Sequence, residues 1–449
     1  MQDKNTQILT GNLRRVALEY IALNVLSMLG LSLYIMADTY FVANGVGNDG
    51  LVALNLVIPA YNVINGLGLL LGVGGATCYS IRIGAGETDT APEFFTLSAA
   101  VGLFTGILLT LTGVFFSRPI AALLGGEGPI LDLASDYLRI MLLFSCAFIL
   151  NQVLVCFVRN DGAPNLAMAA MLAGSASNIV LDYLFIFPLG MGMTGAALAT
   201  GSAPIISALI LLPRLMGSRS HLRICKVREA LSSFKRVLHA GVPSLITEAS
   251  TGIVILLFNA TILRISSQIA VGAYGIITNF SLVGAAIFTG VAQGIQPVIS
   301  VCHGAGKSRR IRQTFGLAAV IVLLLGSAFV TLGILFRDPL TALFNRENDP
   351  EMARIARQGF ALYFPAFVPM GLNIIAVSLT ACIQKPKWAF LLSCLRGFAA
   401  VIPLLLLLSM FFGLEGVFAT VTAAETLTLC VTLIVLRIAL RPSTNYGQI

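Results

Sequence analysis

Two carboxylates interrupt stretches of the chain that are otherwise apolar, Asp38 within residues 31–42 and Asp182 within residues 177–187. A charged side chain is costly inside hydrocarbon, so an acid in such a place usually marks a functional site. Asn178 precedes Asp182 by four residues, and this spacing places both side chains on one helix face. Carboxylate and amide oxygens at one place are suited to hold a proton or a hard cation such as Na⁺.

The composition indicates an all-α integral membrane protein. Of 449 residues, 57% are hydrophobic and 11% are charged, and the mean hydropathy is +0.91. Soluble proteins carry about 25% charged residues. A membrane-spanning helix needs about 20 apolar residues. Segments of suitable length predict twelve spans, near 15–42, 51–78, 94–117, 131–157, 165–188, 193–213, 237–264, 269–301, 314–336, 355–382, 388–412 and 416–438.

The net charge of +8 does not indicate a nucleic-acid partner, because the basic residues crowd the connections on one membrane side. Twenty of the 28 Lys and Arg residues fall in one set of connections, seven fall in the other, and Arg396 lies inside a span. This bias predicts that both termini are cytoplasmic. No cleavage pattern follows a short apolar core at the N-terminus, so we expect the first span to be retained.

Eight cysteines form no C-x-x-C pair. We expect them to be small buried hydrophobic residues, and neither disulfides nor metal ligands.

The two halves of the sequence repeat each other at an offset of about 220 residues. Each single match is weak, because Gly and Pro mark many loops, but several occur in the same order. The matches pair 83–87 with 303–307, 118–124 with 338–344, Pro164 with Pro386, Gly195 with Gly416, and Thr200 with Thr420. A repeat of six spans predicts two bundles related by a pseudo-two-fold axis along the membrane normal.

The repeat divides the chain into an N-terminal lobe of six helices over residues 1–213 and a C-terminal lobe of six helices over residues 237–449. The basic stretch 214–236 is the expected cytoplasmic linker. Two bundles around a central cleft are typical of an alternating-access transporter.

Topology converts residue numbers into depths at about 1.5 Å per residue. Asp38 falls near the outer end of the first span, Asn178 and Asp182 in the outer third of the fifth, and Thr200 just below the outer end of the sixth. We expect these four groups to meet in one pocket that accepts a proton or Na⁺. The alternative is that Asp182 only braces neighbouring helices through Asn178 or Thr200.

The second half lacks this set, since the equivalent positions hold Asn259, Ala400 and Leu404. We therefore expect ion coupling to reside in the first half.

Polar residues deeper in the spans are candidates to bind a substrate. Glu248 and Glu425 lie near the middle of spans seven and twelve, where they would face the cleft and attract a cation. The alternative for each is hydrogen bonding to neighbouring side chains or backbone. Asn259 and Gln152 complete the set of residues expected to contact substrate.

The chain resembles the multidrug and toxic compound extrusion (MATE) family along essentially its whole length. The residues that carry the resemblance are 38–42 (Asp-Thr-Tyr-Phe-Val), 84–86 (Gly-Ala-Gly), 178–182 and 195–200. In the similar bacterial branch, the matching positions imply that Asp38, Asn178, Asp182 and Thr200 hold the coupling cation. They would be metal ligands if that cation is Na⁺. A proline usual in the first span of the family is missing here.

The resemblance implies an antiporter that exports amphipathic organic cations and drugs against entry of H⁺ or Na⁺, with no other cofactor. Membrane lipids would surround it, and it would work as a monomer in the plasma membrane. The alternative is a flippase for lipids or lipid-linked saccharides, on a related fold. No catalytic motif indicates an enzyme, and no filter-like segment indicates a channel.

Overall fold

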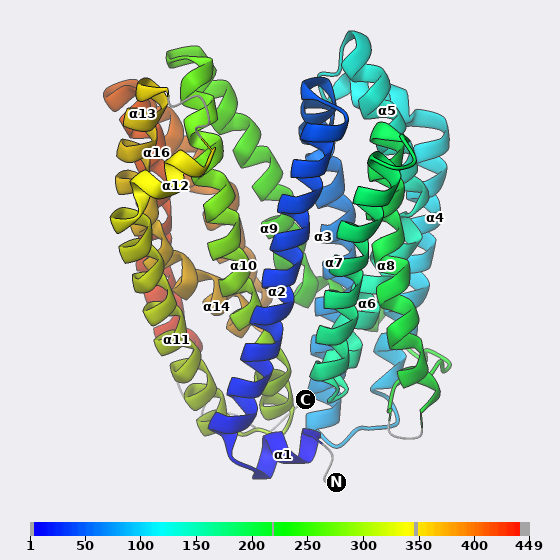
Figure 1. Ribbon diagram of the computed structural model, residues 1–449. Coiled ribbons are helices and arrows are strands. Elements are labelled where there is room, and N and C mark those ends of the chain that lie inside the picture. The colour runs from blue at the N-terminus through cyan, green and yellow to red at the C-terminus, as the bar shows by residue number, and fades with distance from the viewer. Residues whose placement is uncertain (1–3, 218–219, 345–348, 441–449) are drawn as a thin grey trace.

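The computed structural model describes residues 4–217, 220–344 and 349–440, and this part of the chain is built of helices (Figure 1). The first half holds α1 (Lys4–Thr10), α2 (Leu13–Gly45), α3 (Asn48–Gly84), α4 (Pro92–Leu123), α5 (Gly128–Leu143), α6 (Ser145–Asn160), α7 (Pro164–Ile186) and α8 (Gly192–Met216). The second half holds α9 (Ala230–Ile265), α10 (Gln268–Gly304), α11 (Ser308–Leu335), α12 (Arg337–Phe344), α13 (Pro350–Tyr363), η1 (Phe364–Ala366), α14 (Phe367–Cys382), α15 (Pro386–Cys394), η2 (Leu395–Ala399) and α16 (Val401–Ala439).

Twelve membrane passes can be counted in the described residues, which confirms the predicted number. Ten helical runs are long and apolar enough to cross a membrane, and the pair α5 and α6, bent by 50°, makes another pass. One run, Pro386–Ala439, has 54 residues, far more than the roughly 20 that one crossing needs. It breaks at Gly413, where φ is 57°, and a Cβ on Gly416 would lie 1.9 Å from the carbonyl oxygen of Leu408. The chain therefore turns back at Gly413, and this run crosses twice.

The structure confirms the internal repeat. Helices α3 and α10 both have 37 residues, and their bounds differ by 220. Both end in the same way, because Gly86 and Gly306 adopt positive φ angles of 84° and 69°. The backbone N–H of Glu87 donates to the carbonyl of Arg82, and that of Lys307 to the carbonyl of Cys302. Such a glycine stop is a common C-terminal cap, so the matching Gly-Ala-Gly segments are helix ends.

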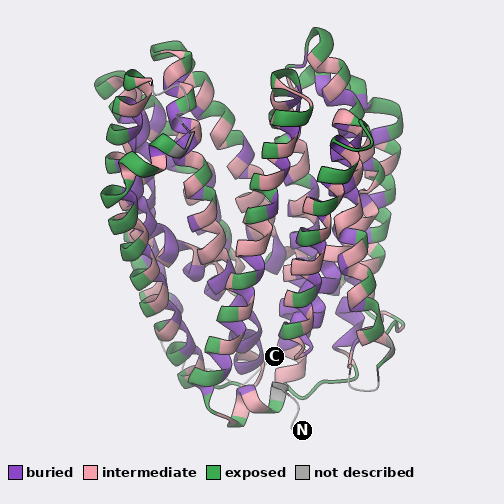
Figure 2. Ribbon diagram, viewed as in Figure 1, coloured by how far each residue is buried: buried purple, intermediate pink, exposed green. Residues whose placement is uncertain are grey.

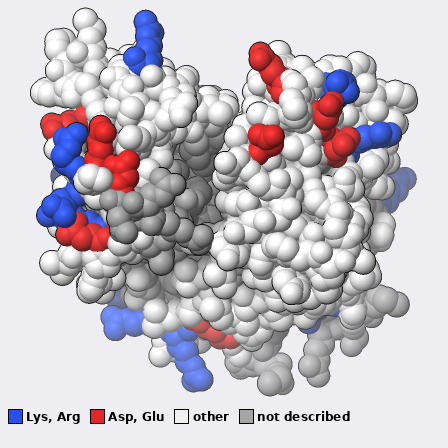
Figure 3. Space-filling model, turned by 45° about the horizontal axis from the view of Figure 1, so that its top comes forward, with Lys and Arg blue, Asp and Glu red and all other residues white. Residues whose placement is uncertain are grey.

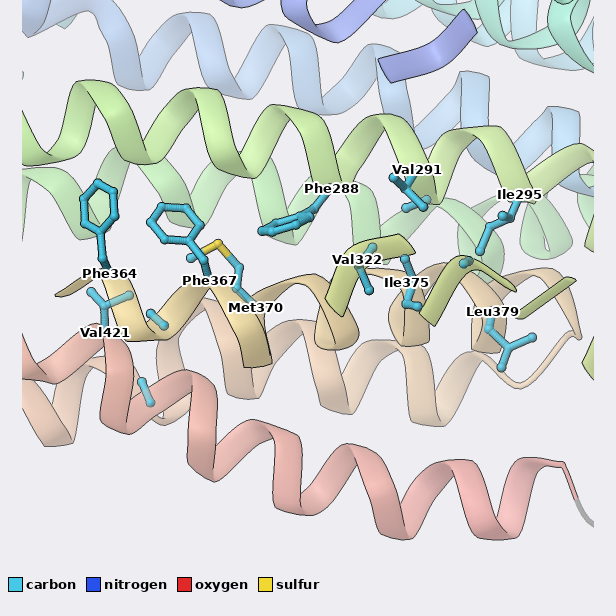
Figure 4. Packing of buried hydrophobic residues seen from close by; sticks show 14 of the residues in the cluster. Phe288, Val291, Ile295, Val322, Phe364, Phe367, Met370, Ile375, Leu379 and Val421 are labelled. Atoms are coloured by element: carbon cyan, nitrogen blue, oxygen red, sulfur yellow. The ribbon is translucent and has the colours of Figure 1, made fainter. Parts of the chain in front are cut away.

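Figure 1 shows the two halves as two bundles that diverge toward the end opposite the termini. Each bundle has an apolar core, and the core of the second half also includes Leu13, Val16, Tyr20 and Ile21 of α2. In the second half, Phe288 of α10 packs against Phe367 at the start of α14, and Val322 of α11 lies beside them (Figure 4). Large exposed apolar residues cover the outer faces of α4, α11 and α16 (Figure 2), as expected for helices in contact with lipid.

The bundles meet closely at the end that carries the termini. A Cβ on Gly84 would lie 2.1 Å from the carbonyl oxygen of Val301, and one on Gly304 would lie 1.9 Å from that of Ile81. These contacts are equivalent in the repeat, because Gly304 and Val301 follow Gly84 and Ile81 by 220 residues. They therefore lie around the pseudo-two-fold axis, with backbone against backbone as glycine permits.

Candidate functional site

The structure brings Asp38, Asn178, Asp182 and Thr200 together inside the first half. Asp38 comes from α2, Asn178 and Asp182 from α7, and Thr200 from α8, and α7 packs against both other helices. Asn178 and Asp182 are fully buried, while Asp38 and Thr200 are 7% and 6% exposed. The carboxyl groups of Asp38 and Asp182 lie close enough to interact.

Asn178 links the acids to α8. Its Nδ2 lies 3.4 Å from the Thr200 hydroxyl. With the amide turned over, Nδ2 donates to Oδ2 of Asp182 at 3.0 Å and Oδ1 accepts from the backbone N–H of Thr200 at 3.3 Å. This second orientation satisfies both ends of the amide, so it is the one expected beside an ionised Asp182.

Two buried oxygens of this cluster lack a partner. Oδ1 of Asp38 and Oδ1 of Asp182 accept no hydrogen bond from the described residues. An unsatisfied buried carboxylate oxygen is costly unless it binds a proton or a cation. The described residues include no group of three or more His, Cys, Asp or Glu side chains around one point, so Na⁺ here would rely on two carboxylates and neutral oxygens.

A cavity of about 380 Å³ separates the two halves. One face of α2 lines it with residues at helical spacing, and α3, α9, α10, α14 and η2 complete the wall. The lining is mainly apolar, with Met28, Leu31, Ile35, Met36, Leu282, Val283 and Ile374 among its members. Figure 3 shows the hollow between the halves, flanked by largely uncharged surface, with acidic and basic side chains on the rims. We call this space the central cleft.

Two of the four residues expected to contact substrate lie at or next to the central cleft. Glu248 of α9 lines it and also lines two adjoining cavities. Gln152 of α6 lines one of these cavities and donates from Nε2 to Oδ1 of Asn65, which does reach the cleft.

Glu425 lines a cavity inside the second half, where its carboxylate forms an ion pair with Arg396 at 2.8 Å, and its contact with substrate stays a prediction. Arg396 reaches the cleft in its place. Asn259 is not among the residues that line these four cavities, and its contact with substrate also stays a prediction. Asn259 belongs to the last two turns of α9, beyond the cleft-lining residues of that helix.

One functional candidate that the sequence analysis missed is Arg159, which the charge count placed in a connection. Its guanidinium is buried and donates from Nη1 to Asn24 Oδ1 at 2.7 Å and to Gln293 Oε1 at 2.6 Å. Gln296 Oε1 accepts from Nη2 at 3.4 Å. Gln293 and Gln296 belong to α10 and Arg159 to α6, so this buried cation joins the two halves near their closed end.

The adjacent Asp161 forms hydrogen bonds that connect several segments at the closed end of the first half. Its carboxylate accepts hydrogen bonds from Tyr79 Oη at 2.6 Å, from Arg214 and from the hydroxyl of Ser220. Burial would raise the pKa of Asp161, but hydrogen bonds from His221 and Tyr79 and the charge of Arg214 outweigh it and lower that pKa. A polar run at 159–161, directly after an apolar span, is the signal that could have suggested a buried network.

Comparison with known proteins matches this architecture to one family. The MatE family model matches residues 24–184 and 243–407. The multidrug export protein MepA of Staphylococcus aureus (strain NCTC 8325 / PS 47) is 27% identical over 402 residues, which cover 88% of this chain and 87% of MepA. MepA of Staphylococcus saprophyticus is 25% identical over 397 residues, with 88% of this chain and 87% of that protein covered.

Solved structures share the fold. A multidrug resistance MATE family transporter of the MOP superfamily, in an outward-facing conformation, superposes with a TM-score of 0.92 at 23% identity over 98% of both chains. These comparisons do not favour the flippase alternative. The family model covers well over half of the sequence and both halves of the repeat, so this multi-pass membrane protein belongs to the MatE family of multidrug export transporters.

Proposed function

We propose that this chain exports amphipathic organic cations in exchange for H⁺ or Na⁺ that binds between Asp38 and Asp182. The observation that carries the proposal is that these two buried carboxylates lie close enough to interact. When both are ionised they repel each other strongly at low dielectric. A bound proton or Na⁺ removes that repulsion and gives the unpaired oxygens a partner.

Helix α2 connects the ion to the cargo. Asp38 faces α7 from one side of α2, where Phe41 also packs on Tyr183 with ring centroids 6.2 Å apart. A different face of α2, which carries Ser32 and Met36, lines the central cleft. Loss of the ion would push α2 away from α7 and change the shape of the cleft. In this account ion and cargo compete through the position of one helix, with no proline in it.

The proposed direction of transport follows from the distribution of basic residues and from the end at which the two halves are closed. Basic residues favour a cytoplasmic location for the termini, which puts the closed end of the molecule inside the cell. The contacts of Gly84 and Gly304 and the bonds of Arg159 hold that end shut. The central cleft would then open outward, ready to release cargo and take up an ion.

The cargo class follows from the lining of the cleft. Its apolar side chains suit a flat hydrophobic body, and Glu248 offers a half-buried carboxylate to a positive charge. An organic cation with aromatic rings satisfies both conditions.

The test is efflux of ethidium from proteoliposomes under a pH gradient and, separately, under a Na⁺ gradient. Asp38→Asn and Asp182→Asn should each abolish efflux under whichever gradient drives the wild type. Asp89→Asn is the matched control, because this carboxylate is 94% exposed in a connection, and it should transport like the wild type. Efflux by either buried variant at the wild-type rate would contradict the proposal.

A further inference from the structure

We propose that Arg396 is the residue in the central cleft that binds the carboxylate of a cargo carrying both a carboxylate and a positive charge. This inference rests on the proposed function, because it concerns the same cleft. Arg396 lines the cleft, one cavity enclosed by helices of both halves and one cavity inside the second half, and its side chain is 16% exposed. A guanidinium in such a position is suited to recognise a carboxylate.

A chain of hydrogen bonds fixes the direction of this guanidinium. The hydroxyl of Thr432 donates to Oδ1 of Asn373 at 2.8 Å, and Nδ2 of Asn373 donates to Oε2 of Glu425 at 2.8 Å. The other carboxylate oxygen, Oε1, accepts from Nε of Arg396 at 2.8 Å. Asn373 and Thr432 are fully buried. Their hydrogen bonds fix the carboxylate of Glu425, whose role is to position Arg396.

The local backbone also orients the side chain of Arg396. Arg396 lies in η2, a π-helical turn between α15 and α16, and π-helical turns often occur at functional sites. Gly397 packs so closely on α9 that a Cβ there would lie 2.8 Å from the Cβ of Ser250. This contact brings η2 against the helix that carries Glu248, and the turn directs Arg396 into the cavities that Glu248 also lines.

Part of the guanidinium is left for a ligand. Glu425 takes Nε, and within the described residues no hydrogen bond occupies Nη1 or Nη2. Arginine presents its donors as a planar fork that can serve two acceptors at once. Glu248 supplies the opposite charge in the same cleft. The cleft thus offers one acidic and one basic anchor around an apolar body.

Two dyes that differ at one group test this assignment. Rhodamine 110 carries a free carboxylate and a delocalised cation, and rhodamine 123 is its methyl ester, a plain cation. Binding of each dye to the purified protein in lipid nanodiscs is followed by fluorescence anisotropy. Arg396→Gln should raise the Kd for rhodamine 110 about tenfold or more, as expected for loss of a hydrogen bond between charged groups. Its Kd for rhodamine 123 should change less than about twofold.

Two further variants separate cargo binding from a structural role. Arg396→Lys keeps the charge beside Glu425 and should retain part of the affinity for rhodamine 110. Glu425→Gln keeps an oxygen for Nε but removes the competing charge, so rhodamine 110 should bind at least as tightly as to the wild type. If Arg396 had only a structural role, Arg396→Gln and Glu425→Gln would each reduce the affinity for both dyes to the same extent.

The outcomes distinguish this inference from the proposed function. If Arg396→Gln reduces the affinity for both dyes equally, or for neither, the proposed role of Arg396 is overturned. A wild-type protein that binds rhodamine 123 but rejects rhodamine 110 also overturns it, while leaving export of cations intact. A wild-type protein that binds neither dye overturns both.

Discussion

Replacing Gly304 by alanine should prevent the two halves from closing as tightly as they do here. The added Cβ would lie 1.9 Å from the carbonyl oxygen of Ile81, whereas a carbon–oxygen contact needs about 3.3 Å. The ends of α3 and α10 must therefore part by about 1.4 Å, a figure that is the difference of these two distances. Backbone lies on both sides of the contact, so no side-chain rotation can relieve it.

The cost can be estimated from overpacking of other buried sites, which is about 1–3 kcal/mol. That energy falls on the closed arrangement and would be relieved when the halves separate at this end. The ratio of closed to open molecules should therefore fall by roughly 5-fold to 150-fold. Gly84→Ala should act in the same way, because its Cβ would lie 2.1 Å from the carbonyl oxygen of Val301.

The assay is a spin–spin distance measurement across the closed end. Labels at Thr88 and Arg309, both exposed, report the separation of the halves after the eight cysteines have been replaced. Gly304→Ala should broaden the distribution toward longer distances. The matched control is Gly275→Ala in the same helix, where a Cβ meets nothing within 4 Å. Identical distributions for wild type, Gly304→Ala and Gly275→Ala would refute the reasoning.

Two further predictions concern the polar groups near the closed end. Arg159→Met removes the donors that join Asn24 to Gln293, so the same spin labels should show more of the open arrangement, and an unchanged distribution would contradict that role. Asp161→Asn should destabilise the protein by about 3 kcal/mol, since Arg214 then loses its buried counter-charge; thermal unfolding measures this. Because the pKa of Asp161 is lowered in the folded state, its stabilisation is present at neutral pH and is lost as pH falls below about 4. The Asn variant should lack that part of the acid sensitivity, and an equal acid loss in both proteins would count against the assignment.

Much of the fold could be predicted because hydropathy and repeats act locally along the chain. The span near 388–412 and the next near 416–438 leave a gap at the residue where α16 turns back, Gly413. The pairing of Asn178 with Asp182 followed from helical spacing, and the depth argument placed Asp38 and Thr200 beside them. Their role as an ion site stays a prediction.

The contacts between distant helices could not be predicted. Arg396 and Glu425 are 29 residues apart and meet through a π-helical turn that no local pattern signals. Arg159 was counted among loop charges because it ends a span, and its partner Gln293 lies 134 residues away in the other half. In both cases the decisive fact is a tertiary contact that neutralises or satisfies a buried charge.

The measurement that bears most directly on the ion site compares cargo binding with coupled transport in Asp182→Asn. Asp182 is fully buried and lies outside the linings of these four cavities, so the variant should bind ethidium with nearly the Kd of the wild type saturated with the coupling ion. In proteoliposomes with an imposed ion gradient it should show no accumulation or efflux above the gradient-free rate. Ethidium efflux that responds to the gradient as in the wild type would contradict the assignment of the coupling ion to Asp38 and Asp182.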